Sequence, residues 1–187
     1  MATTQDRIIE ATLELITQHG LSSVTMVDVA RTAGVARATL YNHYPDVPSI
    51  LADAATRHNE QAIAGLHQHL AVADSPTETI DQLVRYVAAI STHGHTLTTH
   101  HGLPPEHHDQ LAAFDHELER HIHQALEDGT ANGEFRSSLD PDTTTRLVRH
   151  MLNGVSDLVA QTPDNAPHIA REATTTILAA ITSTQPG

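Results

Sequence analysis

The sequence predicts an all-α fold with two parts, an N-terminal three-helix head that contains a helix-turn-helix and a C-terminal helical bundle. Three observations indicate this fold. Apolar residues recur at helical spacing through most of the 187 residues, and no strand-like alternation of useful length interrupts them. Polar caps, prolines and glycines separate the apolar stretches at helical intervals. Residues 25–44, finally, have the pattern of two short helices joined by a tight turn.

The head begins with an amphipathic helix. Ile9, Leu13 and Ile16 recur at i, i+4 and i+7, and we expect them to form its buried face. Gly20 ends this helix, because glycine readily takes the backbone conformation that follows a helix C-terminus.

The helix-turn-helix comes next. Thr25, with Asp28 three residues later, resembles a capping box and marks the start of its first helix. Gly34 lies in the turn, where a sharp reversal needs a positive φ. Residues 36–42 form the second helix, which packs Leu40 inward and is narrow enough to lie in the major groove of DNA.

Longer helices with apolar stripes account for the rest of the chain. Asp46, Ser75 and Asp140 mark helix starts, and a proline directly follows the last two at the first helical position. We expect helices over residues 46–70, 75–90, 105–128, 140–161 and 167–183, a loop over 129–138, and a polar His-rich segment over 92–101 that can form one short helix.

Composition excludes several classes of protein. The chain has no cysteine, so it has neither disulfides nor thiolate metal sites. It lacks a run of roughly 18 apolar residues that could span a membrane. The first residues lack the basic start and apolar core of a signal peptide. We therefore expect a cytoplasmic protein with no membrane partner.

The net charge of −13 is concentrated outside the head. Residues 1–50 hold three arginines and five acidic residues, and all ten cationic side chains of the chain are arginine. A head with so few cations would displace few condensed counterions on DNA, which predicts a shallow salt dependence of binding.

Many residues at fixed spacing between Arg7 and Leu51 match the pattern of one family. The matching pattern, from Ala11 to Tyr44, is A-x-x-x-L-I-x-x-H-G-L-x-x-V-T-M-x-D-V-A-x-x-A-G-V-x-x-x-T-L-Y-x-H-Y. On these residues the first quarter of the chain closely resembles the N-terminal domain of the TetR family of bacterial repressors. Tyr44 matches a usually aromatic position and is expected in the core. The family commonly has a lysine near Val47, so one phosphate contact is missing here.

The resemblance implies a DNA-binding transcriptional regulator, most simply a repressor, and not an enzyme. It implies a DNA-binding domain over residues 4–50, with its motif at about 25–44, and a helical domain over 51–183 that binds an effector and dimerises. The expected partners are a near-palindromic double-stranded DNA operator, a second copy of the chain and a small-molecule effector of unknown identity. No cofactor is expected.

The exposed face of the second motif helix supplies the predicted DNA contacts. Arg37 can span O6 and N7 of guanine, although a phosphate contact or a solvated surface arginine would fit the same sequence. Thr39 can touch a thymine methyl, and the resemblance places Tyr41 and His43 where family members hold phosphates. The predicted DNA-binding set is Thr25, Ala36, Arg37, Thr39, Tyr41, Asn42 and His43.

Two further sets of apolar residues have a simple alternative, the intramolecular core. The last two long helices carry broad apolar faces that can pair with a twofold mate, and the resemblance favours that dimer. The predicted interface consists of Leu147, Met151, Val155, Leu158, Ile169, Ala173, Ile177 and Ile181. The candidates for an effector pocket among the middle helices are Ile63, Leu66, Val87, Ile90, Leu103, Leu111, Phe114 and Met151.

Sixteen histidines raise an alternative function, that of a His-rich metal-binding protein or a metal-responsive regulator. His116, Glu119 and His123 fall at i, i+3 and i+7 on one helix face, which could form half of a metal site. Solvated polar surface is the simpler interpretation in a chain without lysine, so no metal site is predicted. Neither a nucleophile elbow nor a phosphate-binding loop indicates an enzyme.

Overall fold

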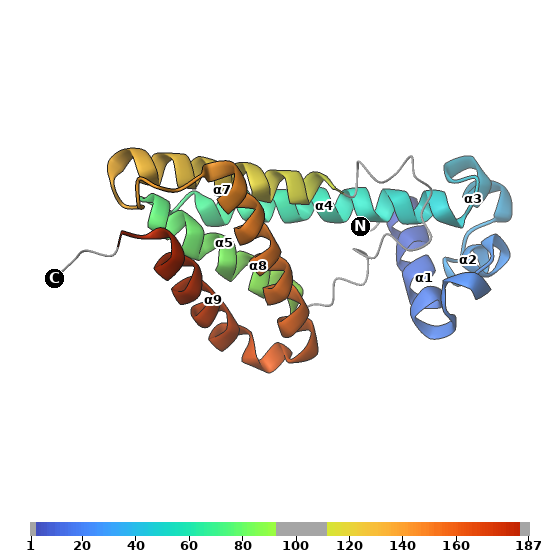
Figure 1. Ribbon diagram of the computed structural model, residues 1–187. Coiled ribbons are helices and arrows are strands. Elements are labelled where there is room, and N and C mark those ends of the chain that lie inside the picture. The colour runs from blue at the N-terminus through green and yellow to red at the C-terminus, as the bar shows by residue number, and fades with distance from the viewer. Residues whose placement is uncertain (1–2, 93–111, 184–187) are drawn as a thin grey trace. The chain divides into compact units, whose positions relative to one another are not determined.

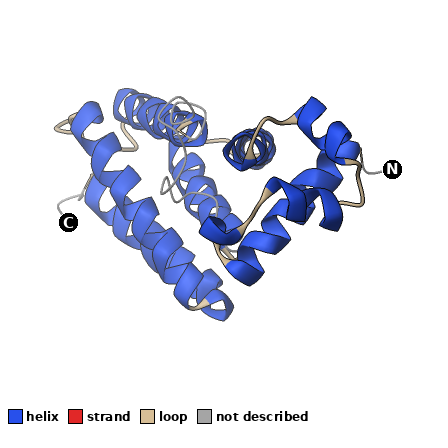
Figure 2. Cartoon of the chain, turned by 90° about the vertical axis from the view of Figure 1, so that its right-hand side faces the viewer, coloured by secondary structure: helices blue, strands red, loops and turns tan. Residues whose placement is uncertain are grey.

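The computed structural model describes residues 3–92 and 112–183. In this part of the chain every regular element is a helix (Figure 1), and the only β feature among the described residues is one isolated bridge, so the predicted all-α fold class is confirmed (Figure 2). None of the described helices is both long and apolar enough to cross a membrane.

The described residues divide into two compact units. The first holds residues 3–59, and the second holds residues 60–92 together with 112–183. The division falls within the helix α4, Val47–Leu70. The functional domain boundary that the sequence suggests, between residues 50 and 51, stays a prediction.

The first unit is built from short helices around one small core. Its other elements are α1 (Thr4–His19), the 3-10 turn η1 (Leu21–Ser23), α2 (Met26–Thr32) and α3 (Arg37–His43). Thr3 caps α1 through a reciprocal pair of hydrogen bonds with Asp6. Gly20 ends α1 with φ +77°, as predicted. The buried apolar residues of the first unit include Ile8, Ala11, Leu15, Val29, Ala30, Ala33, Leu40, Tyr44 and Ile50.

The buried face of α1 differs from the predicted one. Ile9, Leu13 and Ile16 are only partly buried, whereas the buried residues of α1 are Ile8, Ala11, Thr12 and Leu15. Adjacent apolar residues at Ile8 and Ile9 make both faces compatible with helical periodicity. Two features favour the observed face: the small side chain of Ala11, which allows close approach, and the Thr12 hydroxyl, which donates to the Ile8 carbonyl at 2.8 Å and so needs no water.

The second unit is a helical bundle in which α5 packs against three other helices (Figure 1). Its elements after α4 are α5 (Pro76–Ser91), α7 (Ala113–Asn132), α8 (Pro141–Gln161), the 3-10 turn η3 (Pro163–Asn165) and α9 (Ala166–Ile181). The Ser75 hydroxyl accepts the Glu78 N–H at 3.1 Å, which confirms the predicted cap. The fully buried core residues of this unit include Leu66, Ile80, Leu83, Leu118, Ile122, Leu126, Phe135, Leu152 and Ile177.

Helix α7 ends later than predicted. The sequence places a loop over 129–138, but the helix continues through Gly129 to Asn132 and ends at Gly133, with φ +85°. The chain then folds back so that the Phe135 ring lies directly on Gly129, where an added Cβ would be 2.2 Å from Phe135 Cδ2. Glycine is therefore required inside this helix as a packing surface. The predicted start of this helix at residue 105, and the segment 92–101 beyond residue 92, lie outside the described residues.

Candidate DNA-contacting surface

The motif begins at a capped helix. The Thr25 hydroxyl oxygen accepts the Asp28 N–H at 3.3 Å and the hydroxyl donates to the Asp28 carboxylate at 2.5 Å. Arg31 adds an ion pair to the same carboxylate at 2.6 Å. The Thr25 hydrogen bond, assisted by Arg31, lowers the pKa of Asp28 below its ordinary value. The hydroxyl of Thr25, a member of the predicted DNA-binding set, is thus engaged in the cap of α2, and it would have to turn its proton toward DNA.

The turn between α2 and α3 is held by a residue that the sequence did not single out. Arg7, on α1, donates from Nη2 to the carbonyls of Ala33 at 2.8 Å and Gly34 at 3.1 Å. Gly34 has φ +62°, as the turn requires, and Val35 N–H reaches back to the Ala30 carbonyl at 3.0 Å. One arginine thus satisfies two carbonyls at the end of α2. No spacing rule connects residues 7 and 33, so the sequence pattern could not reveal this contact.

Helix α3 presents most of the predicted DNA-binding residues on its exposed surface. Leu40 is fully buried beneath them and fixes the helix to the core. Tyr41 is 54% exposed, and Thr39 is partly buried. The remaining predicted side chains of this helix and its N-cap, Ala36, Arg37, Asn42 and His43, are all exposed.

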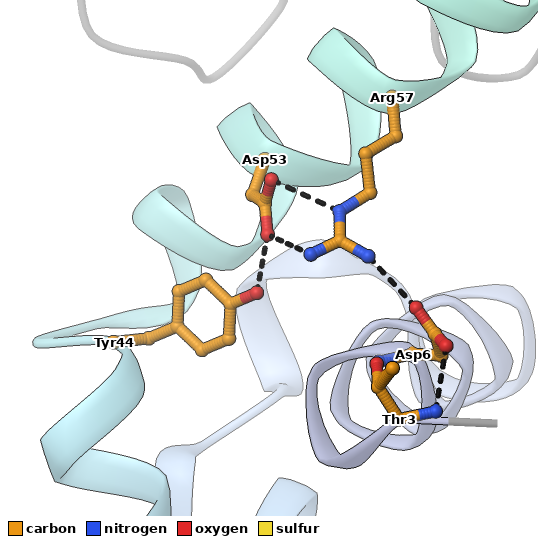
Figure 3. A network of polar contacts seen from close by, with 5 residues as sticks. All are labelled: Thr3, Asp6, Tyr44, Asp53 and Arg57. Carbon is orange, nitrogen blue, oxygen red and sulfur yellow. Dashed lines mark hydrogen bonds and ion pairs between the residues drawn. The ribbon is translucent and has the colours of Figure 1, made fainter.

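A polar network fixes the chain directly after α3 (Figure 3). The Tyr44 hydroxyl donates to the Asp53 carboxylate. Arg57 donates to the same carboxylate from Nε and Nη2, both at 3.1 Å, and from Nη1 to Asp6 at 2.7 Å. The ring of Tyr44 is buried, as predicted, but its hydroxyl binds a carboxylate. The network therefore joins the end of α3 to both α4 and α1.

The ionisation states of this network reinforce one another. Burial and the hydrogen bond to Asp53 raise the pKa of Tyr44 above its ordinary value, so the phenol stays protonated and donates. Burial alone would raise the pKa of Asp53, but hydrogen bonds from Tyr44 and Arg57 outweigh it and lower that pKa. The result is a carboxylate that stays ionised with its donors in place.

Arg37 differs from the other arginines in the described part of the first unit. Arg7 binds backbone carbonyls, while Arg31 and Arg57 bind carboxylates. Within the residues that the structure describes, Arg37 is exposed and its guanidinium makes no hydrogen bond or ion pair. Its guanidinium can therefore approach a base or a phosphate without first losing a protein partner.

The predicted effector residues are core or partly buried positions of the second unit. Leu66 and Val87 are buried in its core, and Ile63, Ile90, Phe114 and Met151 are partly buried. Leu103 and Leu111 lie outside the described residues.

The predicted dimer residues fall into two groups. Val155, Ile177 and Ile181 are buried in the core of their own chain. Leu147 and Leu158 on α8 are 60% and 53% exposed, and Met151, Ile169 and Ala173 are partly buried. A second copy of the chain could therefore contact the exposed and partly buried residues. The three buried side chains could only pack beneath those residues within their own chain.

The half-site that His116, Glu119 and His123 could form is not assembled among the described residues. His123 lies 3.1 Å from Asp142 and 3.6 Å from Glu127, and His116 is exposed. Another trio of potential ligands, His67, Glu117 and His121, does come together.

Comparison with known proteins gives consistent matches over both units. The family model described as bacterial regulatory proteins, tetR family, matches residues 8–47, and that of a tetracyclin repressor-like C-terminal domain matches residues 73–157. The HTH-type transcriptional repressor KstR2 of Mycolicibacterium smegmatis is 24% identical over 154 residues, which cover 79% of this chain and 75% of that protein.

Two further relatives span more of the chain. The HTH-type transcriptional regulator AqdR of Rhodococcus erythropolis is 28% identical over 184 residues, covering 89% of this chain and 81% of that protein. The crystal structure of the TetR family transcriptional regulator PfmR from Thermus thermophilus is 26% identical, has a TM-score of 0.76, and covers 100% of both chains.

Proposed function

Because this chain belongs to the TetR family of bacterial DNA-binding transcriptional regulators, we propose that it acts as a homodimeric repressor. In this proposal the dimer binds a near-palindromic operator and leaves it when a small-molecule effector binds. The observation that carries the proposal is the exposed, unpartnered guanidinium of Arg37 on α3, within the described residues.

Each α3 would enter the major groove with Arg37 as its base reader. A guanidinium can donate to both O6 and N7 of guanine, which fixes one base pair per half-site. Tyr41 and His43, exposed on the same helix, would hold phosphates through the phenol hydroxyl and the ring N–H. The Tyr44 network sets the position of α3 and so the register of these contacts.

Two copies would meet through the exposed face of α8. Leu147, Met151, Gly154 and Leu158 recur at intervals of four, three and four residues, so they share one side of the helix. Exposed leucines at this spacing favour pairing with an identical helix about a twofold axis. Such a dimer would place two recognition helices on one face of the DNA, one helical turn or a multiple of it apart.

An effector would act by population shift. A ligand that binds the second unit more tightly in a dimer whose heads are misplaced for DNA must lower operator affinity, by linkage. The described residues that would line its site are Ile63, Leu66, Val87, Ile90, Phe114 and Met151. The comparisons favour a DNA-binding transcriptional regulator over a His-rich metal-binding protein.

Selection of bound sequences from random double-stranded DNA tests the proposal. The expected result is an enriched site with twofold symmetry and a guanine in each half. A lack of enrichment over several rounds, in low salt, would contradict the proposal. Enrichment of a single unpaired half-site would contradict the dimer alone.

A further inference from the structure

Three side chains that could bind a metal ion meet in the second unit. His67 lies in the last turn of α4, and Glu117 and His121 lie one turn apart on α7. His67 Nε2 is 2.5 Å from Glu117 Oε1, and His121 Nε2 is 3.3 Å from the same oxygen. One ligand atom from each residue lies within 4.8 Å of the other two. No other trio in the described residues meets that condition.

The donors and their spacing suit zinc. Two imidazoles and one carboxylate are a common zinc ligand set, and they leave a fourth position for water. Bonds of about 2.0–2.1 Å in a tetrahedron put ligand atoms roughly 3.4 Å apart, which these side chains can reach by small rotations. The sequence did not suggest this set, because His67 is far from the other two residues along the chain.

A cationic side chain already points at the same atoms. Arg120 Nη2 lies 2.6 Å from Glu117 Oε1 and 2.9 Å from His121 Nε2. Since a guanidinium has only donors, the Arg120 contact is a hydrogen bond in the tautomer that leaves the lone pair on His121 Nε2, which is also the tautomer that binds a metal through that nitrogen. The Arg120 side chain is 58% exposed, so it can swing into water without uncovering core.

We propose that His67, Glu117 and His121 form a zinc-binding site, in which the metal displaces the guanidinium of Arg120. The ion would tie the end of α4 to α7 and stabilise the second unit. This proposal concerns binding and stability, and it does not depend on how the chain recognises DNA.

Titration of untagged, chelator-treated protein with Zn²⁺ tests the site, with Co²⁺ as a spectroscopic probe of tetrahedral ligation. We expect one ion per chain at this site and a higher melting temperature with zinc. His67→Asn and His121→Asn should each weaken zinc binding by at least about tenfold, since even supporting residues of metal sites have effects of that size. His123→Asn is the matched control, because His123 also lies on α7 beside carboxylates, and it should bind zinc as wild type does.

The variant Arg120→Gln distinguishes zinc binding at the proposed site from zinc binding by histidines elsewhere in the chain. Removing the competing cation should tighten zinc binding, while a site at other residues would not respond. The far-ultraviolet circular dichroism of each metal-free variant checks that it folds. The proposal would be overturned if wild type does not bind zinc. It would also be overturned if zinc binding is unchanged in both His67→Asn and His121→Asn, or if it is weaker in Arg120→Gln than in wild type.

Discussion

At the scale of single residues, the first unit uses its arginines for two purposes. Arg7 and Arg57 position backbone and helices, whereas Arg37 remains available to DNA. This allocation matters because the unit contains no lysine to take over phosphate binding. Local capping rules found Thr25, but the roles of Arg7 and Arg57 depend on contacts between elements that no spacing rule describes.

Tyr44→Phe tests the network behind α3. The substitution keeps the buried ring and removes only the hydroxyl that donates to Asp53. We expect the free energy of unfolding at pH 7 to fall by about 1.5–3 kcal/mol, the usual contribution of a hydrogen bond to a charged group. Chemical denaturation of wild type and Tyr44→Phe measures this difference in the free energy of unfolding. Tyr41→Phe is the matched control, because Tyr41 is exposed, and it should change stability little.

We also expect the stability difference between wild type and Tyr44→Phe to depend on pH. The folded pKa of Asp53 lies below its ordinary 3.8. A carboxylate with a lowered folded pKa contributes stability that is complete above its unfolded pKa and is lost as the pH falls through the folded value. The stability difference between wild type and Tyr44→Phe should therefore shrink as the pH falls below 3.8. A difference that grows in acid would show that Asp53 is not the partner that matters.

At the scale of elements, features that neighbouring residues determine were predicted better than features that depend on packing between elements. Helix starts at Ser75 and Asp140 and the turn at Gly34 were predicted correctly, because caps and positive φ depend on neighbouring residues. The face of α1 and the end of α7 were predicted wrongly, because both are decided by what packs against them. In the sequence, Gly129 indicates the end of a helix, but in the structure it is a position inside the helix against which Phe135 packs.

Gly129→Ala tests this packing. The new methyl group would lie 2.2 Å from Phe135 Cδ2, so the helix or the ring must shift. Although alanine favours helix, we expect a net destabilisation of about 1–3 kcal/mol, the usual cost of overpacking. Thermal or chemical unfolding measures it, and the double variant with Phe135→Leu should recover part of the loss. Stabilisation by Gly129→Ala alone would contradict this account of the bend.

At the scale of the whole molecule, the proposed dimer gives the exposed apolar face of α8 a purpose. Leu158→Glu should weaken self-association, since it places a charge within the proposed apolar interface. Sedimentation velocity over a range of protein concentrations measures the effect. Val72→Glu is the matched control, because Val72 is 62% exposed and lies outside the predicted interface. Equal dimer stability in both variants would place the interface elsewhere.

Charge sets a second property of the whole molecule. With a net charge of −13 and few free cations in the head, the proposed dimer should displace few counterions from DNA. We expect the logarithm of operator affinity to fall against the logarithm of salt concentration with a slope between about −2 and −4. Binding measured over a series of NaCl concentrations gives this slope. A slope near −10 would mean that many more arginines reach phosphates than the described structure leaves free.

The central claim is that α3 reads sequence through Arg37. The most direct measurement is fluorescence anisotropy of DNA flanking the chain's own gene, comparing wild type with Arg37→Ala and with Arg85→Ala, whose arginine is paired with Asp81 in the second unit. We predict tight, specific binding by wild type and Arg85→Ala, and a loss of about 1–3 kcal/mol in Arg37→Ala together with relaxed preference at one base pair of each half-site. Specific binding that Arg37→Ala leaves unchanged would contradict the claim.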